Sequence, residues 1–440
     1  MIIAILVLAI IVLVLLITKL KLHPFLALLL VSLATGLVMG MKTDALLSAI
    51  QTGFGDTLGK IGLVIILGVL IGSFLEHTGA AMVLAKAILS IVGQKRIITA
   101  MGVIGYMISI PVFCDSAFIL LSTLNKTLSR KAGVSIAATS VALALGLLAT
   151  HTLVPPTPGP VAAAGILGAD LTKVILLGFV IAAAATAAGI LFASKIAVKT
   201  IIETTEKLVE QNQSKPPSTF KSALPVLVPI LLIILKSVSI YFADAGWQST
   251  LKSIFLFTGE PFIALLIGFA CCLLLPERIV KKMFAADGWT GKALESAASI
   301  LFITAAGGVF GKVLQQADAA GELGEALTAS SLGLFLPFLL AAILKTAQGS
   351  STVAMITAAS VLSPLMASLG FISEWDKAMV VIAVGAGSMV ISHVNDSFFW
   401  VVTQFTGMNV KTGYKLLSLG TFIVGTVAMI ALSIVSFFFR

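Results

Sequence analysis

The sequence predicts an all-α polytopic membrane protein, and three observations lead to this fold class. Of the 440 residues, 59% are hydrophobic and only 11% are charged. Several apolar runs approach the length of about 20 residues that a helix needs to cross a bilayer. These runs follow one another along the chain, whereas a water-soluble domain would have to bury each of them on every side.

Eight stretches are expected to cross the membrane as single helices. They are residues 2–18, 24–41, 61–76, 174–194, 223–242, 261–275, 294–315 and 413–438. The first stretch has no basic segment before it and no small-residue cleavage site after it. It is therefore expected to be a retained span and not a signal peptide.

Four further apolar stretches are interrupted by residues that end helices. The interruptions read SIPVFCDS, THTLVPPTPGP, LKTAQGSST and SHVNDS, within residues 97–130, 134–168, 332–369 and 377–406. Proline removes a backbone donor, and Ser, Thr, Asn and Asp side chains offer the backbone other hydrogen-bond partners. Each stretch is therefore predicted to contain a helix break.

Two of the interrupted stretches are predicted to be re-entrant hairpins. The arms of residues 97–130 have about 14 residues, or roughly 21 Å, against a hydrocarbon core of about 30 Å. Basic residues such as Lys95 and Arg130 lie at both ends of this stretch. A hairpin keeps both ends in the cytoplasm, where basic residues are retained. Residues 332–369 have acidic flanks and are expected to enter from the outside.

These choices predict about ten transmembrane helices in two halves, 1–195 and 222–440, joined by a cytoplasmic linker at 196–221. Each half contains two spans, a third span, a hairpin, a broken span and a final span, which makes five crossings. An odd number of crossings gives the second half the opposite orientation, an inverted repeat that is typical of secondary transporters.

The net charge of +9 fits this topology, because about two thirds of the 28 Lys and Arg residues fall on the predicted cytoplasmic side. These charges are dispersed and form no stripe, so no nucleic-acid partner is expected. The expected partners are the lipid bilayer and a small organic anion.

If the hairpins enter from opposite faces, their tips meet the two helix breaks near the middle of the membrane. Irregular backbone at this depth is tolerated where it is buried in protein or lines a wet cavity. The four polar segments are therefore predicted to form one site for substrate binding and coupling. Its expected residues are Asp115, Ser116, Thr150, His151, Thr152, Thr157, Lys345, Thr346, Gln348, Gly349, Ser350, Ser351, Thr352, Ser392, His393, Asn395, Asp396 and Ser397.

The residue types of this site suit an anion that carries hydroxyl groups. Helix N-termini and Lys345 attract a carboxylate, and hydroxyl and amide side chains serve sugar hydroxyls as donors and acceptors. Burial favours the protonated form of Asp115 and Asp396, so either carboxyl can carry a proton with the substrate, as can the histidines. The structural alternatives are that Lys345 only pairs with an aspartate and that Asp115 only caps a helix starting at Ala117.

Three strings resemble segments of the gluconate permease (GntP) family, bacterial inner-membrane carriers of gluconate, related sugar acids and, in one branch, D-serine. They are SIPVFCDSAFILL, THTLVPPTPGPVAAAGILGADL and SHVNDSFFW, and the resemblance extends over nearly the whole chain. It implies proton symport and membership of the ion transporter superfamily, in which two hairpins and two broken helices form a mobile domain on a dimeric scaffold. An elevator-type transporter and a homodimer are therefore implied, with Asp115, His151, Lys345, His393, Asn395 and Asp396 in the transport domain.

The leading hypothesis is a proton-coupled symporter of gluconate or a near relative, with no cofactor and no metal site. Cys114 stands where gluconate permeases commonly have an aromatic residue, so the substrate within the family stays open. A sodium-coupled carrier of carboxylates or of a D-serine-like amino acid is the alternative. An intramembrane enzyme is a remote one, since the chain contains no GxSxG, HExxH or phosphate-loop motif. A passive channel is disfavoured because the hairpins would obstruct a pore.

Overall fold

The computed structural model describes residues 2–202, 216–241, 249–317 and 332–438, and these contain helices and no β-strand, which confirms the all-α fold class. The first half contains α1 (Ile2–Thr18), α2 (Pro24–Val38), α3 (Thr43–His77), α4 (Ala80–Val92), α5 (Ile97–Ile108), α6 (Cys114–Ala132), α7 (Ile136–Leu153), α8 (Pro158–Leu167) and α9 (Leu171–Lys195). The second half contains α10 (Thr219–Tyr241), α11 (Ser249–Thr258), α12 (Pro261–Cys272), α13 (Trp289–Gln316), α15 (Phe335–Gln348), α16 (Ser351–Leu362), α17 (Glu374–Met389), α18 (Ser397–Thr406), α19 (Val410–Gly413), a π-helical segment (Tyr414–Ser418) and α20 (Leu419–Ser436).

Six helical segments in the described part of the chain are long and apolar enough to cross a bilayer, which indicates a multi-pass membrane protein. They are Thr43–His77, Ile136–Leu167, Leu171–Lys199, Thr219–Lys236, Lys281–Gln316 and Val410–Ser436. A seventh is counted if α11 and α12, which meet at a bend of 74°, form one span. The total of about ten crossings stays a prediction.

The chain leaves helical geometry at each of the four predicted interruptions. We name these segments, with their flanking polar residues, the first tip (109–116, between α5 and α6), the first break (150–157, between α7 and α8), the second tip (345–352, between α15 and α16) and the second break (390–397, between α17 and α18). The re-entrant course of the two helix pairs and the inverted repeat stay predictions.

Helices α7 and α17 lie at the centre of the molecule. Every residue of α7 is buried, and α17 is buried from Ala378 to Met389. A helix that is apolar and covered on every side is packed inside protein. α17 contacts α7, α9, α15 and α20. Because α7 and α17 lead directly into the two breaks, each break adjoins this central core. The first break is almost entirely buried, whereas Ile391, Val394, Asn395 and Ser397 of the second break are exposed.

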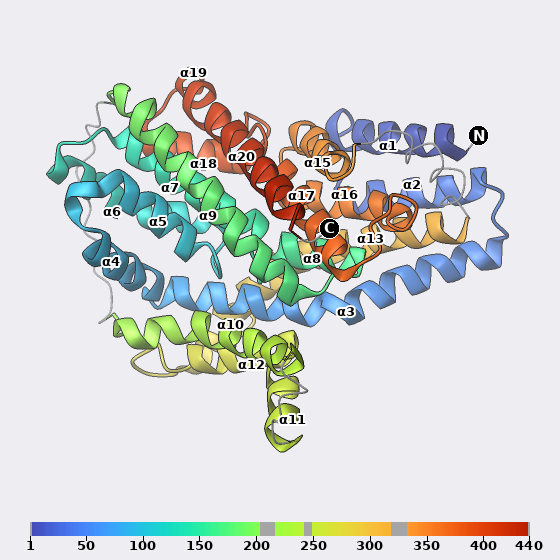
Figure 1. Cartoon of the computed structure of the whole chain (residues 1–440), viewed down its shortest axis with the longest axis horizontal. Helices are drawn as coiled ribbons and strands as arrows, with labels where there is room; N and C mark the ends of the chain where they lie inside the picture. Colours follow the sequence, from blue (N-terminus) through green and yellow to red (C-terminus); the bar gives the residue numbers. More distant parts are fainter. Residues whose placement is uncertain (1, 203–215, 242–248, 318–331, 439–440) are drawn as a thin grey trace.

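The longest helix, α3, runs along most of the molecule and packs against α13 (Figure 1). A Cβ atom on Gly53 would lie 2.8 Å from the carbonyl oxygen of Gly308, so glycine allows the two backbones to approach closely. In the same view, α10 and α12 lie on the other side of α3 from α5, α7 and α9.

Some predicted boundaries were wrong. The expected span 61–76 is the C-terminal half of α3, which begins at Thr43. Asp44, Asp56 and Lys60 lower the hydropathy of its N-terminal half, but these residues are exposed and the helix continues through them. The expected span 261–275 is the shorter α12, whose first turn contains Pro261, and α4 was not predicted at all.

Part of the predicted domain division cannot be compared with the structure. The linker at 196–221 is described at its ends, while residues 203–215 lie outside the described residues. The acidic flank before the second hairpin, residues 318–327, lies outside them as well. The division into two halves stays a prediction.

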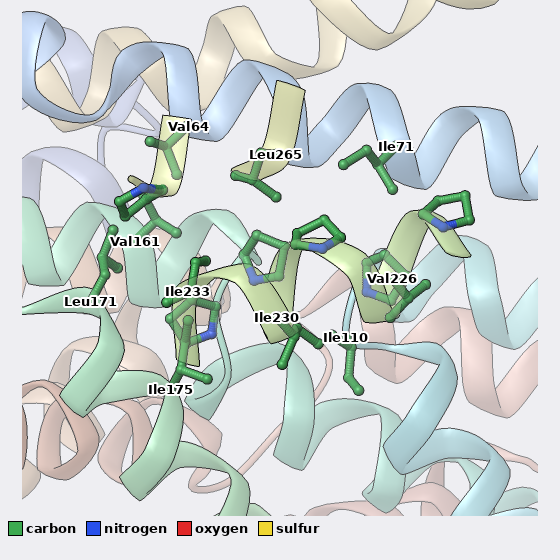
Figure 2. A pocket seen from close by; sticks show the side chains of 16 residues that line it. Val64, Ile71, Ile110, Val161, Leu171, Ile175, Val226, Ile230, Ile233 and Leu265 are labelled. Atoms are coloured by element: carbon green, nitrogen blue, oxygen red, sulfur yellow. The ribbon is translucent and has the colours of Figure 1, made fainter. Parts of the chain in front are cut away.

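An apolar pocket lies between the first tip, the first break and helices α3, α9, α10 and α12 (Figure 2). Its lining consists of Val, Ile, Leu and Pro side chains, among them Pro111, Pro156, Pro229 and Pro261. A charged, hydroxylated ligand would find no hydrogen-bonding side chain there, and burying its polar groups without partners is costly. Such a ligand would find hydrogen-bonding groups instead in the four polar segments.

Candidate functional site

The second break forms because its own polar side chains replace helical hydrogen bonds. α17 ends at Met389, the backbone is extended at Val390, and Ile391 adopts a φ of 52°. Asp396 then caps α18, because its Oδ1 accepts a hydrogen bond of 3.0 Å from the backbone N–H of Phe398. The sequence SHVND thus ends one helix and starts the next.

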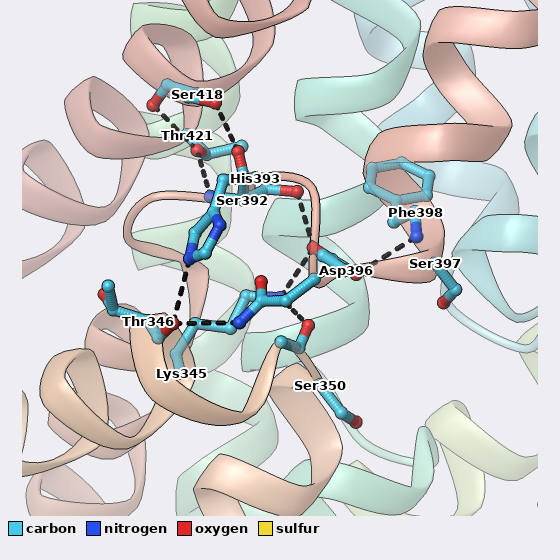
Figure 3. A network of polar contacts seen from close by, with 12 residues as sticks. Lys345, Thr346, Ser350, Ser392, His393, Asp396, Ser397, Phe398, Ser418 and Thr421 are labelled. Atoms are coloured by element: carbon cyan, nitrogen blue, oxygen red, sulfur yellow. Dashed lines mark hydrogen bonds and ion pairs between the residues drawn. The ribbon is translucent and has the colours of Figure 1, made fainter. Parts of the chain in front are cut away.

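Lys345 and Asp396 form an ion pair at the centre of the site (Figure 3). The Nζ of Lys345 lies 2.6 Å from Oδ2 of Asp396, and the two side chains are only 1% and 5% exposed. Lys345 also donates a hydrogen bond of 2.6 Å to the carbonyl oxygen of Gly349, and Ser392 Oγ donates one of 2.5 Å to Asp396 Oδ2. A buried charge requires such partners, because leaving it unpaired in a low-dielectric interior is costly.

The second tip is bound to the second break by further hydrogen bonds. His393 Nε2 lies 2.9 Å from the carbonyl oxygen of Thr346. A carbonyl accepts only, so this nitrogen carries the proton. Asn395 Nδ2 donates to the same oxygen at 2.9 Å and to that of Ala347 at 3.2 Å. Two side chains of the break thus satisfy carbonyl groups near the end of α15 that have no partner within the helix.

Gly349 is required at the second tip for two reasons. Its φ of 83° lies in the left-handed region that favours glycine. A Cβ atom at this position would also collide with the carbonyl oxygen of Asn395.

The second break is also hydrogen-bonded to Thr421 of α20 and to Ser418 just before it. The sequence did not predict these contacts. The backbone N–H of Ser392 donates to Thr421 Oγ1 at 3.0 Å, and Ser418 Oγ donates to the carbonyl oxygen of Ser392. Thr421 in turn donates to the carbonyl oxygen of Ser418 at 2.9 Å. Ser418 ends the π-helical segment that precedes α20, a type of distortion that is frequent at functional sites.

The first tip meets the second break at Asp115. Ser397 Oγ donates a hydrogen bond of 3.2 Å to Asp115 Oδ2. The other oxygen, Oδ1, is buried and has no hydrogen-bond partner among the described residues. The alternative that Asp115 caps a helix starting at Ala117 was wrong, because α6 begins at Cys114 and Asp115 lies within its first turn.

The first break contributes His151, a buried residue in the last turn of α7. Its ring centroid lies 5.8 Å from that of Phe113 in the first tip. The Nδ1 atom of His151 and the Oγ1 atom of Thr150 are buried without a partner in the part of the chain that the structure describes. Thr152 and Thr157 instead donate to their own backbone, at Leu148 and Val154, so these hydroxyls shape the break.

The backbones of the first break and the first tip pack closely against neighbouring helices at glycine residues. A Cβ atom on Gly385 of α17 would meet the carbonyl oxygen of Thr152. On α3, Cβ atoms at Gly68 and Gly72, one turn apart, would meet the carbonyl oxygens of Pro156 and Pro111. Helix α8, which follows the first break, packs closely against α16, because a Cβ on Gly159 would lie 2.9 Å from the sulfur atom of Met355.

The structure therefore brings all four polar segments into one contiguous region, although not every residue faces the same partners. Ser350 caps α16 by accepting from the N–H of Val353 at 3.3 Å, and the Thr346 hydroxyl binds its own helix at Ala342. Both amide atoms of Gln348 are buried without a partner among the described residues. Ser116 and Thr352 are partly buried, and Ser351 is buried.

The arrangement offers an anion one positive charge and several hydrogen-bonding groups. The described residues contain no group of three or more His, Cys, Asp or Glu side chains that could hold a metal. Lys345 supplies a positive charge, the caps of α16 and α18 place two helix N-termini beside it, and the partnerless polar atoms are donors and acceptors for hydroxyl groups.

Comparison with known proteins gives a consistent result over the full length. Residues 1–438 match the family model described as GntP family permease. The chain is 33% identical over 420 residues to the gluconate permease of Pseudomonas aeruginosa, covering 92% of this chain and 90% of that one. It is 31% identical over 442 residues to the D-serine transporter DsdX of Escherichia coli O6:H1, covering 98% and 97% of the two chains.

Among solved structures, the YdaH transporter of Alcanivorax borkumensis is similar, with a TM-score of 0.66. The match covers 94% of this chain and 99% of that chain at 14% sequence identity. At this level of identity, the likeness concerns the fold alone.

Proposed function

This chain belongs to the GntP permease family, and we propose that it imports gluconate or another small hydroxylated carboxylate together with a proton. Members of this family are permeases, so the chain is a membrane transporter and not an enzyme. The observation that carries the proposal is the nearly inaccessible ammonium group of Lys345 at the meeting point of a helix tip and a helix break.

A carboxylate group is the substrate feature that Lys345 recognises. Charged side chains inside the membrane region are costly and are usually functional. The N-termini of α16 and α18 carry partial positive charge and begin next to Lys345 and Asp396. A substrate carboxylate placed there is stabilised by the full charge of Lys345 and by both helix ends.

Hydroxyl groups on the substrate are supported by the polar atoms around this charge. The amide of Gln348, Nδ1 of His151 and Oγ1 of Thr150 are buried and have no hydrogen-bond partner within the described ranges. Buried polar atoms in native proteins almost always have partners. A polyhydroxylated acid such as gluconate supplies donors and acceptors for all three side chains.

A hydroxy amino acid such as D-serine is the second candidate, and one contact favours it. Asp115 Oδ1 is a buried acceptor without a partner in the described part, and a substrate ammonium group can donate to it. The similarity to the D-serine transporter DsdX agrees with this candidate. Competition of unlabelled D-serine against labelled gluconate distinguishes the two substrate classes.

Uptake into proteoliposomes tests both substrate and coupling ion. We expect the purified chain to accumulate labelled gluconate when the outside is made acidic, and to show no added uptake from an inward sodium gradient at equal pH. Liposomes without protein are the control. Accumulation driven by sodium and indifferent to the pH gradient would establish the sodium-coupled alternative in place of proton symport.

We also propose the elevator motion, homodimer and bacterial inner-membrane location implied by the resemblance. The apolar pocket supports the motion, because α10 and α12 meet the first tip and first break there through side chains without hydrogen-bonding groups. Such a surface can slide without exchanging hydrogen bonds. Cross-linking of single-cysteine variants on α10 against the first tip, in the presence and absence of gluconate, measures the displacement.

A further inference from the structure

We propose that Asp396 takes up the co-transported proton, and that its protonation transfers Lys345 from Asp396 to the carboxylate of the substrate. This assignment rests on the proposed function. It adds the residue that couples the proton to the anion and the reason why the two travel together.

The first argument is the net charge of the buried Lys345–Asp396 pair when the substrate binds. Lys345 and Asp396 together are neutral, and both side chains are almost completely buried. Adding a substrate anion to this pair would leave one uncompensated negative charge in a region of low dielectric. Adding a proton to Asp396 at the same time leaves the total charge of the site unchanged. The site then contains Lys345 paired with the substrate, beside the uncharged carboxylic acid of Asp396.

The second argument is that Asp396 has other partners to keep when it loses Lys345. Its Oδ1 accepts from the N–H of Phe398, and its Oδ2 lies 2.5 Å from Ser392 Oγ. A proton from the aqueous side binds Oδ2, and the resulting O–H donates to Ser392 Oγ, whose hydroxyl rotates from donor to acceptor. The break and the cap of α18 therefore survive protonation.

The third argument is that Lys345 needs to exchange only one partner. Its ammonium group has three donors, one of which binds the carbonyl oxygen of Gly349 at 2.6 Å. This bond lies within the second tip and is independent of Asp396. Lys345 thus stays anchored while the donor that faced Asp396 turns to the substrate carboxylate.

Other titratable groups face the same region and are less suited to this exchange. Asp115 and His151 interact electrostatically with Lys345 and Asp396, and Cys114 lies beside them. The Asp115 carboxyl accepts its hydrogen bond from the neutral Ser397, so protonating Asp115 releases no cation. His393 already donates its Nε2 proton to a carbonyl group. Asp396 is the carboxylate whose protonation frees Lys345.

The decisive experiment compares two assays on Asp396→Asn, using the full chain in proteoliposomes and labelled gluconate. Asparagine mimics the protonated acid, so we expect exchange of gluconate across the membrane at equal pH to persist within about tenfold of the wild type. Accumulation driven by a pH gradient should be lost.

The matched control is Glu374→Gln, which neutralises the acid of the exposed Glu374–Lys377 ion pair and should leave both assays unchanged. If the wild type fails to accumulate gluconate under a pH gradient, the proposed function itself is wrong. If the wild type accumulates gluconate and Asp396→Asn still does so under the same gradient, only the assignment of Asp396 is overturned.

A second variant covers the case in which Asp396→Asn does not fold, judged by loss of the monodisperse gel-filtration peak. Asp396→Glu retains a titratable group on a longer side chain, so we expect pH-driven accumulation with a displaced pH profile. An unchanged profile, or no uptake from folded protein, overturns the assignment.

Discussion

Ser397 and Asp115 lie 282 residues apart in the sequence and are joined by a hydrogen bond of 3.2 Å between the second break and the first tip. This bond connects two polar segments of the proposed substrate site that are far apart in the sequence. The contact between the two segments therefore depends in part on a single hydroxyl group, which a point mutation can remove.

Replacing this hydroxyl tests the connection. Ser397→Ala removes the donor and leaves Asp115 Oδ2 without the hydrogen bond from Ser397. A hydrogen bond contributes about 0.5–1.5 kcal/mol, and 1.4 kcal/mol corresponds to about tenfold, so gluconate uptake should fall by up to about tenfold. Initial uptake rates in proteoliposomes measure the effect. Ser90→Ala, in which an exposed serine of α4 loses a bond to its own helix, is the control. Equal rates for both variants would contradict a role for this bond.

Removing the charge of Lys345 should abolish uptake and destabilise the protein. In Lys345→Gln, Asp396 is left as a buried charge without a counterion, and breaking a buried pair from one side costs about 3–5 kcal/mol. A lower melting temperature and the absence of gluconate uptake are expected. The double variant Lys345→Gln/Asp396→Asn should recover the melting temperature without recovering uptake. Wild-type transport by Lys345→Gln would refute the role of Lys345 in holding the carboxylate.

Substituting two glycines in turn distinguishes the effect of backbone strain from the effect of a collision with the second break. Gly349 and Gly370 have similar φ angles of 83° and 78°, but a Cβ at Gly370 would meet nothing within 4 Å. Gly370→Ala should therefore lower stability by about 1–2 kcal/mol through left-handed strain alone and leave uptake intact. Gly349→Ala should abolish uptake as well, because its Cβ displaces Asn395. Thermal unfolding and uptake measured on both variants give the comparison, and similar uptake by the two would argue against tight packing at the tip.

The contacts from α20 predict a role for residues outside the four polar segments. Ser418→Ala leaves the buried carbonyl group of Ser392 unsatisfied at a cost of about 1–3 kcal/mol, and uptake should fall by about tenfold with an altered pH profile. Thr421→Val should act similarly, and Thr421→Ser should restore uptake because it retains the hydroxyl. Ser433→Ala, which removes a bond within α20 itself, is the control. Normal uptake and an unchanged pH profile in Ser418→Ala would show that these bonds do not position the break.

The helix interruptions were predictable from the sequence because their causes are local. Pro155, Pro156 and Pro158 remove backbone donors, and Asp396 caps the helix that follows it, so neighbouring residues alone predict both breaks. The length of α3 was not predictable from hydropathy, because exposed polar residues are compatible with a helix that packs along one face. The course of the spans relative to the membrane stays a prediction.

The partners within the site depend on tertiary contacts that no local pattern contains. The sequence indicated that Lys345 needs a counterion but not whether Asp115 or Asp396 supplies it, since both lie in polar interruptions far from it. Ser418 and Thr421 were missed because hydroxyl residues in an apolar helix commonly bind their own backbone. The π-helical segment that directs them toward Ser392 has no signature in composition.

Gly68 and Gly72 lie one turn apart on α3. Because neither has a side chain, the carbonyl groups of Pro156 and Pro111 pack directly against the backbone of this helix. The prolines of the first tip and first break are thus positioned by contacts that involve no side chain of the proposed substrate site. Residues such as His151 and Ser116 can then be replaced by others without disturbing these contacts. Under the proposed function, an architecture of this kind permits the side chains that face the substrate to change while the supporting backbone stays the same.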